Sequence, residues 1–192
     1  MLIGLTGKAQ AGKDTVGSIL FLNHGFMRVA FADPVKEAAA AMYDLSLVDF
    51  HDNALKERID HRWGLSPRSM VQQLGEMVKE RFGPDFWVDN WFHRYSKVGE
   101  SNHVIVTDVR FDNEAQRIIE LGGVIIEVVR DDSGLSGENA AHVSEAGIKR
   151  KLINCTIVNN STKRNLAAYM DILVSSAMPV QVELDFTKEA TK

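Results

Sequence analysis

Residues 1–15, MLIGLTGKAQAGKDT, decide the fold of this chain. They open with a short apolar run that ends in a glycine, which is typical of a buried parallel strand. Residues 7–15 then match the phosphate-binding pattern G-x-x-x-x-G-K-[ST] except at Asp14, which stands where Ser or Thr usually follows the lysine. Thr15 supplies a hydroxyl one residue later. A phosphate-binding loop between a strand and a helix predicts an α/β fold.

The residues around this loop favour a phosphate site over a chance match. A helix follows, and Gly25 is placed to end it. Main-chain N–H groups of the loop can therefore face a phosphate at the positive end of the helix dipole, and Gly7 and Gly12 allow a close approach of the backbone. Lys13 supplies a charge for the outer phosphates. A tight turn alone would explain the glycines, but not a lysine at the position that the phosphate-binding pattern requires.

Asp14 is the unusual residue of the loop. A carboxylate beside a triphosphate is repelled unless it points away, contacts metal-bound water or caps the helix. We favour an acid in the first helical turn, where the helix dipole stabilises a negative charge. The contact with metal-bound water stays open.

The rest of the chain alternates strands with helices. A sheet of five largely parallel strands, with helices on both faces, is therefore the expected three-layer architecture. The further strands are expected at 26–32, 103–110, 124–130 and 155–160, and the further helices at 34–44, 66–82, 85–97, 112–121 and 162–176. In the first of these helices we expect Asp33 as the N-cap and Pro34 in the first turn. Residues 45–65 are irregular apart from a turn near NALKERI, and the tail 180–186 is an edge strand or extended chain.

No boundary divides the chain into independent domains, so we expect one domain over residues 1–192. Its core should comprise about 1–33 and 100–176. The helical stretch of about 34–99 should be an insert that covers the substrate. The polar, glycine-containing stretch of about 130–145 should be a lid.

Composition narrows the class of protein. The chain is 45% hydrophobic, has a net charge of −4 and contains one cysteine, Cys155, which we expect in a buried strand. The negative charge favours a small anionic ligand in a basic cleft over a nucleic-acid polymer. We expect a cytoplasmic protein, since a lone cysteine suits a reducing compartment and no apolar run is long enough to span a membrane.

A second group of polar residues follows the strand at 103–110, in the stretch TDVRFDNE. Ligands of open α/β sheets bind outside the carboxyl ends of the strands, where Asp108, Arg110 and Glu114 should lie. An acid at the end of an apolar strand is typical of a residue that holds Mg²⁺ directly or through water. Asp108 and Arg110 could instead clamp a substrate phosphate and sugar, or form an ion pair with each other.

Cations elsewhere could bind the remaining phosphates. Phosphoryl transfer needs positive charge on both the donor and the acceptor phosphates. Lys36, Arg62 and Arg68 precede the strand at 103–110, and Arg130 enters the expected lid. Each could also be an ordinary surface residue. Trp87 could stack on a base, although its helical position equally suits the core.

Taken together, these motifs resemble the bacteriophage deoxynucleoside monophosphate kinases, a branch of the P-loop nucleotide kinases. The resemblance covers most of the chain, and the GKDT form of the loop belongs to it. The matching stretches are GLTGKAQAGKDT, FADPVKEA, RSMVQQLG, DFWV, TDVRFDNEAQRIIELGGVIIEVVR, HVSEAG and TIVNNST.

The resemblance implies transfer of the γ-phosphate of ATP to a deoxynucleoside monophosphate, with Mg²⁺, to supply precursors for DNA synthesis. Lys13, Asp108 and Arg110 would be catalytic, and Asp108 and Thr15 would hold the metal, in part through water. ATP would be bound by Gly7, Ala11, Gly12, Lys13, Asp14, Thr15 and Arg130. The monophosphate would be bound by Lys36, Arg62, Arg68, Gly75, Trp87, Asp108, Arg110 and Glu114. A second copy of the chain is a candidate partner, and His142, Ser144 and Glu145 of HVSEAG have no derived role.

Two other functions remain open. A kinase acting on dephospho-coenzyme A shares the GLTG start, although the aromatic and basic stretch 66–94 favours a nucleotide acceptor. A nucleotide-binding regulatory protein without turnover would not need Asp108 and Arg110. The residues do not show which bases are accepted.

Overall fold

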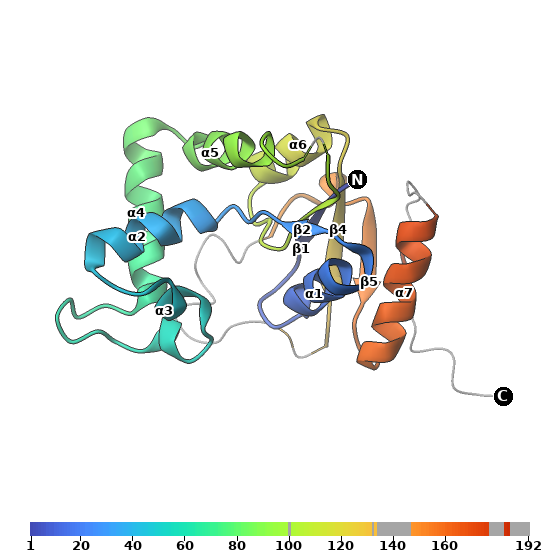
Figure 1. The fold of residues 1–192 in the computed structure, drawn as a ribbon, viewed down its shortest axis with the longest axis horizontal. Helices are drawn as coiled ribbons and strands as arrows, with labels where there is room; N and C mark the ends of the chain where they lie inside the picture. Colours follow the sequence, from blue (N-terminus) through green and yellow to red (C-terminus); the bar gives the residue numbers. More distant parts are fainter. Residues whose placement is uncertain (100, 132, 134–146, 177–182, 185–192) are drawn as a thin grey trace. The chain divides into compact units, whose positions relative to one another are not determined.

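A parallel sheet of six strands organises the chain. The computed structural model describes residues 1–99, 101–131, 133, 147–176 and 183–184. Within these residues the strand order is β2-β3-β1-β4-β5-β6, and every neighbouring pair is parallel. Figure 1 labels β1, β2, β4 and β5 on the ribbon. The strands are β1 (Leu2–Thr6), β2 (Met27–Arg28), β3 (Val104–Val106), β4 (Val124–Val129), β5 (Cys155–Val158) and β6 (Glu183–Leu184). The five expected strands are all present, and the tail adds the short sixth one.

The chain divides into two compact units. The first comprises residues 1–30 and 95–192 and contains the sheet, and the second comprises residues 31–94. The second unit falls largely within the range of about 34–99 that we expected for an insert. No helix among the described residues is long and apolar enough to cross a membrane.

Two strands are shorter than their apolar runs. Of residues 26–32, Met27 and Arg28 alone form a ladder with β3, because the chain then passes into the second unit, where Phe31 packs on Trp91 with ring centroids 4.6 Å apart. The strand expected at 103–110 ends at Val106. The expected range at 26–32 was therefore too long because its last residues belong to the second unit.

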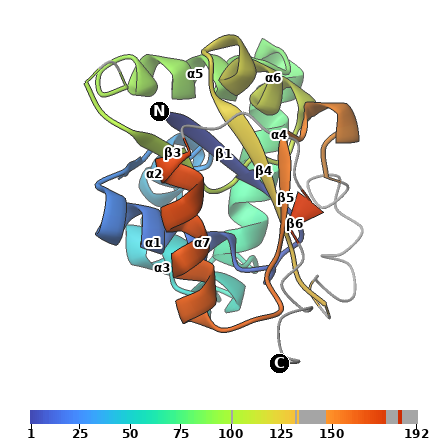
Figure 2. The same ribbon diagram turned by 90° about the vertical axis from the view of Figure 1, so that its right-hand side faces the viewer.

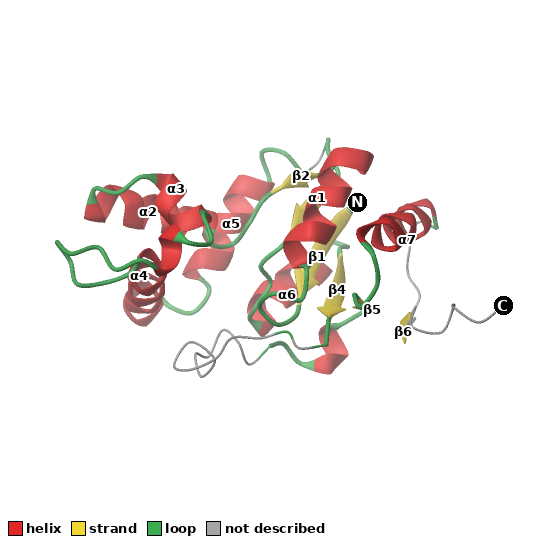
Figure 3. Cartoon of the chain, turned by 90° about the horizontal axis from the view of Figure 1, so that it is seen from below, coloured by secondary structure: helices red, strands yellow, loops and turns green. Residues whose placement is uncertain are grey.

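Helices cover both faces of the sheet (Figures 2 and 3). On one face, α1 (Lys13–His24) and α7 (Lys163–Ser175) pack side by side over a core that includes Leu5, Ile126 and Ile157. On the other face, α6 (Asp112–Glu120) lies on β1 and β4, where Gly4 leaves room for Ile118. Gly25 ends α1 in a left-handed conformation, as expected.

Cys155 lies in β5 with 3% of its surface exposed, which confirms the expected burial. Burial raises the pKa of its thiol, because the charged thiolate loses hydration. The thiol is therefore a structural group of the core.

The second unit is helical. Its helices are α2 (Asp33–Tyr43), α3 (Leu47–His51), the 3-10 helix η1 (Leu55–Glu57), α4 (Pro67–Phe82) and α5 (Phe86–Tyr95), whose last residue belongs to the first unit. Ser66 caps α4 by accepting a hydrogen bond from the Ser69 amide, and Gly83 ends it, as expected. For α2 the expectation was wrong by one residue, because the N-cap is Ala32 and Asp33 is already helical.

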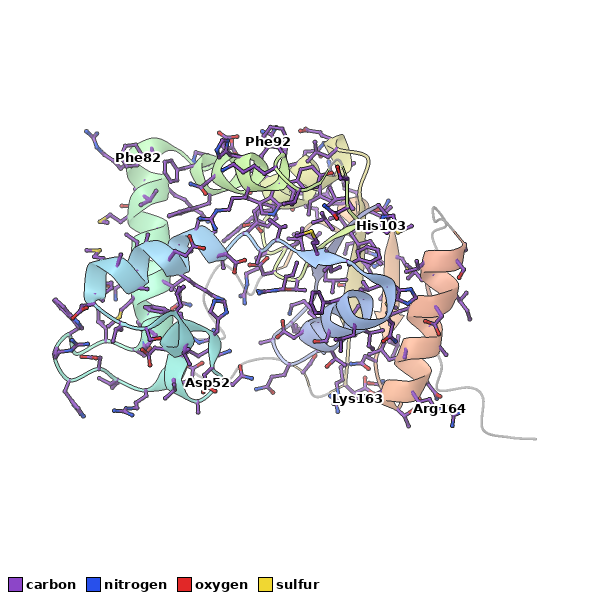
Figure 4. All side chains as sticks on the ribbon, in the orientation of Figure 1. Asp52, Phe82, Phe92, His103, Lys163 and Arg164 are labelled. Atoms are coloured by element: carbon purple, nitrogen blue, oxygen red, sulfur yellow. The ribbon has the colours of Figure 1, made fainter. Side chains whose placement is uncertain are left out.

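The irregular stretch 45–65 holds more structure than expected. Ser46 and Asp49 form a reciprocal capping box that starts α3. The Asp52 carboxylate accepts bonds from the Ala54 and Leu55 amides at 2.8 and 2.9 Å and starts η1 (Figure 4). These bonds lower the pKa of Asp52. Local side-chain caps, rather than an apolar stripe, therefore organise this segment.

Candidate active site

The loop between β1 and α1 has the backbone of a phosphate-binding loop. Gly7 and Gly12 have φ angles of 129° and 105°, which side chains rarely adopt, and Gln10 has a φ of 65°. A Cβ on Gly7 would collide with the Val128 carbonyl of β4. The loop therefore lies directly against the neighbouring strand, as a glycine alone permits.

Lys13 is bonded back onto its own loop. Its Nζ donates to the Gly7 carbonyl at 2.6 Å and to the Lys8 carbonyl at 2.8 Å. Gly12, the N-cap of α1, has no side chain that could cap the helix, so the loop lies at the positive end of the helix dipole, where an anion is favoured. The geometry combines a cation with main-chain donors at the end of β1.

Asp14 and Thr15 lie in the first turn of α1. Asp14 is exposed, and it is not the capping residue of the helix. Its position fits an acid favoured by the helix dipole. Thr15 is half-buried.

Sequence reasoning missed Asn159, which follows β5. Its Nδ2 donates to the Ala11 carbonyl at 2.8 Å, across 148 residues of sequence. The same amide nitrogen fills the space beside Gly12, where a Cβ would collide with it. The stretch TIVNNST was among the matching motifs, but no local pattern indicates that its first asparagine contacts the loop.

Asp108, Arg110 and Glu114 lie between β3 and the first turn of α6. Glu114 is 6% exposed, and its Oε2 accepts hydrogen bonds from the Arg110 amide at 2.7 Å and the Phe111 amide at 3.0 Å. Asp108 and Arg110 are half-buried. Glu114 therefore fixes the backbone at Arg110 and starts the helix.

A further cation lies beside this group. The Arg28 Nε, from β2, donates to the Thr107 Oγ1 at 3.1 Å, and Thr107 directly precedes Asp108. The sequence offered no signal for this contact, because Arg28 and Thr107 lie 79 residues apart in the chain.

In the second unit the expected cations are held by side chains. The Arg68 Nε donates to the Glu57 carboxylate at 2.6 Å, and the Arg62 Nη2 contacts Asp60 at 3.0 Å. The Asp60 pKa is lowered by its bonds from Arg62. The Lys36 Nζ lies 3.4 Å from the His51 Nδ1.

Gly75 and Trp87 contact each other in this unit. The Trp87 indole N–H donates to the Gly75 carbonyl at 3.1 Å, and 8% of the Trp87 surface is exposed. The contact joins α5 to α4, so both residues have a packing role, and their role in ligand binding stays a prediction.

Comparisons with known proteins decide the family. The model of the family described as deoxynucleotide monophosphate kinase matches residues 48–170. An Acanthamoeba polyphaga mimivirus protein, provisionally named a deoxynucleotide monophosphate kinase, is 33% identical over 178 residues, covering 84% of this chain and 90% of the viral protein. This chain belongs to the deoxynucleotide monophosphate kinase family. It is an ATP-dependent phosphotransferase, and the expected family is confirmed.

Solved structures confirm the fold of this kinase. TT1252 from Thermus thermophilus has a TM-score of 0.53 at 17% identity and covers 93% of this chain and 98% of its own. The dephospho-CoA kinase of Campylobacter jejuni has a TM-score of 0.50 at 14% identity and covers 91% and 96%. At such low identity the likeness concerns the fold alone.

The structure groups the expected site residues of the kinase by unit. Because β1 and β3 are parallel neighbours, the phosphate loop and the residues after β3 lie at the same edge of the sheet. This first group comprises Gly7, Ala11, Gly12, Lys13, Asp14, Thr15, Asp108, Arg110 and Glu114. The second unit holds Lys36, Arg62, Arg68, Gly75 and Trp87.

Arg130 directly follows β4 and is exposed. The next residue, Asp131, pairs with Asn160: its amide donates to the Asn160 Oδ1 at 2.9 Å, and its carboxylate accepts from the Asn160 Nδ2 at 2.8 Å. Most of the expected lid, with His142, Ser144 and Glu145, lies outside the described residues.

Proposed function

We propose that the phosphate loop of this kinase binds ATP and that the residues after β3, with cations of the second unit, bind the deoxynucleoside monophosphate. A terminal oxygen of the acceptor phosphate attacks the γ-phosphorus of ATP. The bond from that phosphorus to the bridging oxygen breaks, and ADP leaves. The products are ADP and a deoxynucleoside diphosphate.

The observation that carries the proposal is the conformation of the loop. Lys13 bonds to the carbonyls of Gly7 and Lys8, at the N-terminus of α1, so its charge is already held on the loop. In the reaction Lys13 exchanges these carbonyls for the outer phosphates of ATP. Catalysis of this kind is mostly positioning and charge stabilisation, so a preformed loop supplies much of it.

The acceptor phosphate is assigned to Lys36, Arg68 and Arg110. Arg62, Gly75, Trp87, Asp108 and Glu114 complete the proposed monophosphate pocket. No strong general base is needed, because the attacking phosphate oxygen is already ionised. Arg110 is supported by its backbone, which Glu114 holds at 2.7 Å.

The donor set fits Mg²⁺ bound mainly by phosphates. In the part of the chain that the structure describes, no three His, Cys, Asp or Glu side chains gather as a metal site. Mg²⁺ in kinases commonly uses one or two carboxylates together with substrate phosphates and water. Asp108 and Thr15 would hold it here, in part through water, and the ion would share the charge of the outer ATP phosphates.

The two alternative functions are less well supported. Likeness to a dephospho-CoA kinase rests on 14% identity, whereas the family match covers residues 48–170. A regulatory protein without turnover would bind ATP and leave it intact.

A phosphotransfer assay tests the proposal. Purified protein is incubated with ATP, Mg²⁺ and each of the four deoxynucleoside monophosphates, their ribonucleotide counterparts and dephospho-coenzyme A, and the products are separated. We expect a deoxynucleoside diphosphate from at least one substrate. Lys13→Ala should lower kcat/KM at least about a hundredfold, the usual loss on removing one group that stabilises transition-state charge.

Lys97→Ala is the matched control, because Lys97 is an exposed lysine of the first unit, away from the loop in sequence. Lack of any diphosphate product, or equal rates for wild type and Lys13→Ala, would overturn the proposal. Turnover of dephospho-coenzyme A alone would support the first alternative.

We also propose that the kinase works in the cytoplasm, that of the host if a phage carries it, without nucleic acid or membrane. A homodimer is proposed as well, and light scattering would measure its mass.

A further inference from the structure

We propose that Asn159 is a positioning residue for ATP, which orients the peptide between Ala11 and Gly12 so that the Gly12 amide faces the phosphates. This role rests on the proposed function of the loop. It adds a residue that is 148 positions away in the sequence to the ATP loop of residues 7–15.

The backbone of Asn159 is held in place by β4. Its backbone N–H donates to the Val129 carbonyl at 2.7 Å, which extends the pairing of β4 and β5 by one residue. The side chain starts from a fixed point at the carboxyl end of the sheet, and it is half-buried. A short side chain on a fixed backbone can hold its hydrogen-bond partner in one place.

The Asn159 side chain in turn orients the peptide between Ala11 and Gly12. The Asn159 Nδ2 donates to the Ala11 carbonyl at 2.8 Å. In a trans peptide, the carbonyl and the following N–H point in opposite directions. Because the Ala11 carbonyl points toward Asn159, the Gly12 N–H points away from it. An amide oriented in this way is a donor for phosphate that needs no rearrangement when ATP arrives.

Asn159 also packs against the next residue of the loop, Gly12. A Cβ on Gly12 would collide with the Asn159 Nδ2, and Ala11 itself is fully buried. Asn159 therefore contacts two consecutive residues of the loop, by a hydrogen bond to one and by packing against the other. Without it, the Ala11 carbonyl loses its bond and the peptide is free to rotate.

Asn160 provides a matched control. It is the same residue type at the same strand exit, but its side chain pairs with Asp131 through bonds of 2.8 and 2.9 Å. A general effect of truncating an asparagine beside β5 should appear in both variants. An effect that acts through the phosphate loop should appear in the Asn159 variant and not in the Asn160 variant.

The experiment compares Asn159→Ala, Asn159→Asp and Asn160→Ala with wild type. ATP binding is titrated directly, and KM is measured separately for ATP and for the preferred deoxynucleoside monophosphate. We expect Asn159→Ala to raise the Kd and KM for ATP at least about tenfold, since a buried carbonyl is left unpaired and a phosphate donor is misdirected. The KM for the monophosphate should change less than about threefold.

Asn159→Asp should weaken ATP binding at least as much, because a carboxylate cannot donate to the Ala11 carbonyl and adds negative charge near the phosphates. Equal ATP affinity of Asn159→Ala and Asn160→Ala would overturn the proposal, as would equal losses for ATP and monophosphate. If wild type binds ATP but makes no diphosphate, the proposed function fails, whereas the ATP titrations still decide the role of Asn159.

Discussion

The two units hold their proposed phosphate-binding residues in different ways. In the first unit the contacts run to main-chain atoms: Lys13 to the Gly7 and Lys8 carbonyls, Asn159 to the Ala11 carbonyl and Glu114 to the Arg110 amide. In the second unit they run between side chains, from Arg68 to Glu57 and from Arg62 to Asp60.

The difference separates a preformed site from an exchangeable one. The strands and helices that the loop joins fix its backbone before phosphate binds, and the Lys13 side chain exchanges its carbonyl partners for the phosphate. The Arg62–Asp60 and Arg68–Glu57 pairs are partly exposed, so water screens them and a phosphate can replace the carboxylate at small cost. We infer that the first unit offers a fixed backbone to a phosphate, whereas the cations of the second unit are able to change partners.

The largest effect is expected where the preformed loop meets the sheet. Gly7→Ala places a Cβ against the Val128 carbonyl at a φ of 129° and should lower the free energy of unfolding by about 3 kcal/mol, because two backbone segments must separate. ATP binding should be lost with it. Chemical unfolding curves and ATP titrations measure the two effects.

Gly64→Ala is the control for this prediction. Gly64 also has a positive φ, of 65°, but no atom of the described residues lies within 4 Å of its Cβ position, so the cost should be about 1 kcal/mol. Equal losses of stability in the two variants would show that the close approach to β4 adds nothing to the loss of unfolding free energy in Gly7→Ala.

A smaller effect tests the exchangeable side of the comparison. Arg68→Ala should raise the KM for the monophosphate about tenfold, the typical loss of a charge-assisted hydrogen bond. Glu57→Gln keeps the shape but weakens the competing partner of Arg68, so it should lower that KM up to about fivefold. Steady-state kinetics at saturating ATP measure both. A higher KM in Glu57→Gln would mean that Glu57 positions Arg68 rather than competing for it.

The smallest effect concerns an ion pair outside the proposed site. Arg94 donates two hydrogen bonds to Glu37, at 2.8 and 2.6 Å, and thereby lowers the Glu37 pKa below its ordinary value of 4.5. Because the folded-state pKa is the lower one, the stabilisation is present above the unfolded-state pKa and is lost as the pH falls through the folded-state value. Both side chains are partly exposed, so the effect should stay below about 1 kcal/mol.

Unfolding curves between pH 3 and 7, on wild type and Glu37→Gln, check this prediction (a pH range set by the ordinary carboxyl pKa, about 4). The variant should show the weaker loss of stability on acidification. Identical pH profiles would contradict it.

Local sequence patterns predicted those elements that are determined by residues close together in the sequence. The apolar runs predicted β1, β4 and β5 at nearly the right residues, and Gly25 predicted the end of α1 correctly. Each of these signals acts over a few residues through capping or a positive φ. The phosphate loop was predictable for the same reason, because its glycines and lysine lie within residues 7–13.

Other features depend on partners far away in the sequence. Met77 is an apolar residue of α4, yet 52% of its surface is exposed, because a helix pattern does not show how wide a face its neighbours cover. The five-residue α3 is too short for periodicity. Asn159 meets the loop across 148 residues, and no local pattern could indicate that contact.

The pairing of β1 has a consequence for the order of folding. Ile3 pairs with Ile105 and also with Val124, so the first strand has no neighbour on either side until more than half of the chain has been synthesised. Contacts of such high sequence separation slow folding, whereas the helical residues 31–94 make local contacts that form early. On the ribosome, the segment that carries Lys36 and Arg68 is therefore able to fold before the strands on either side of β1 have been synthesised and the phosphate loop can take its final structure.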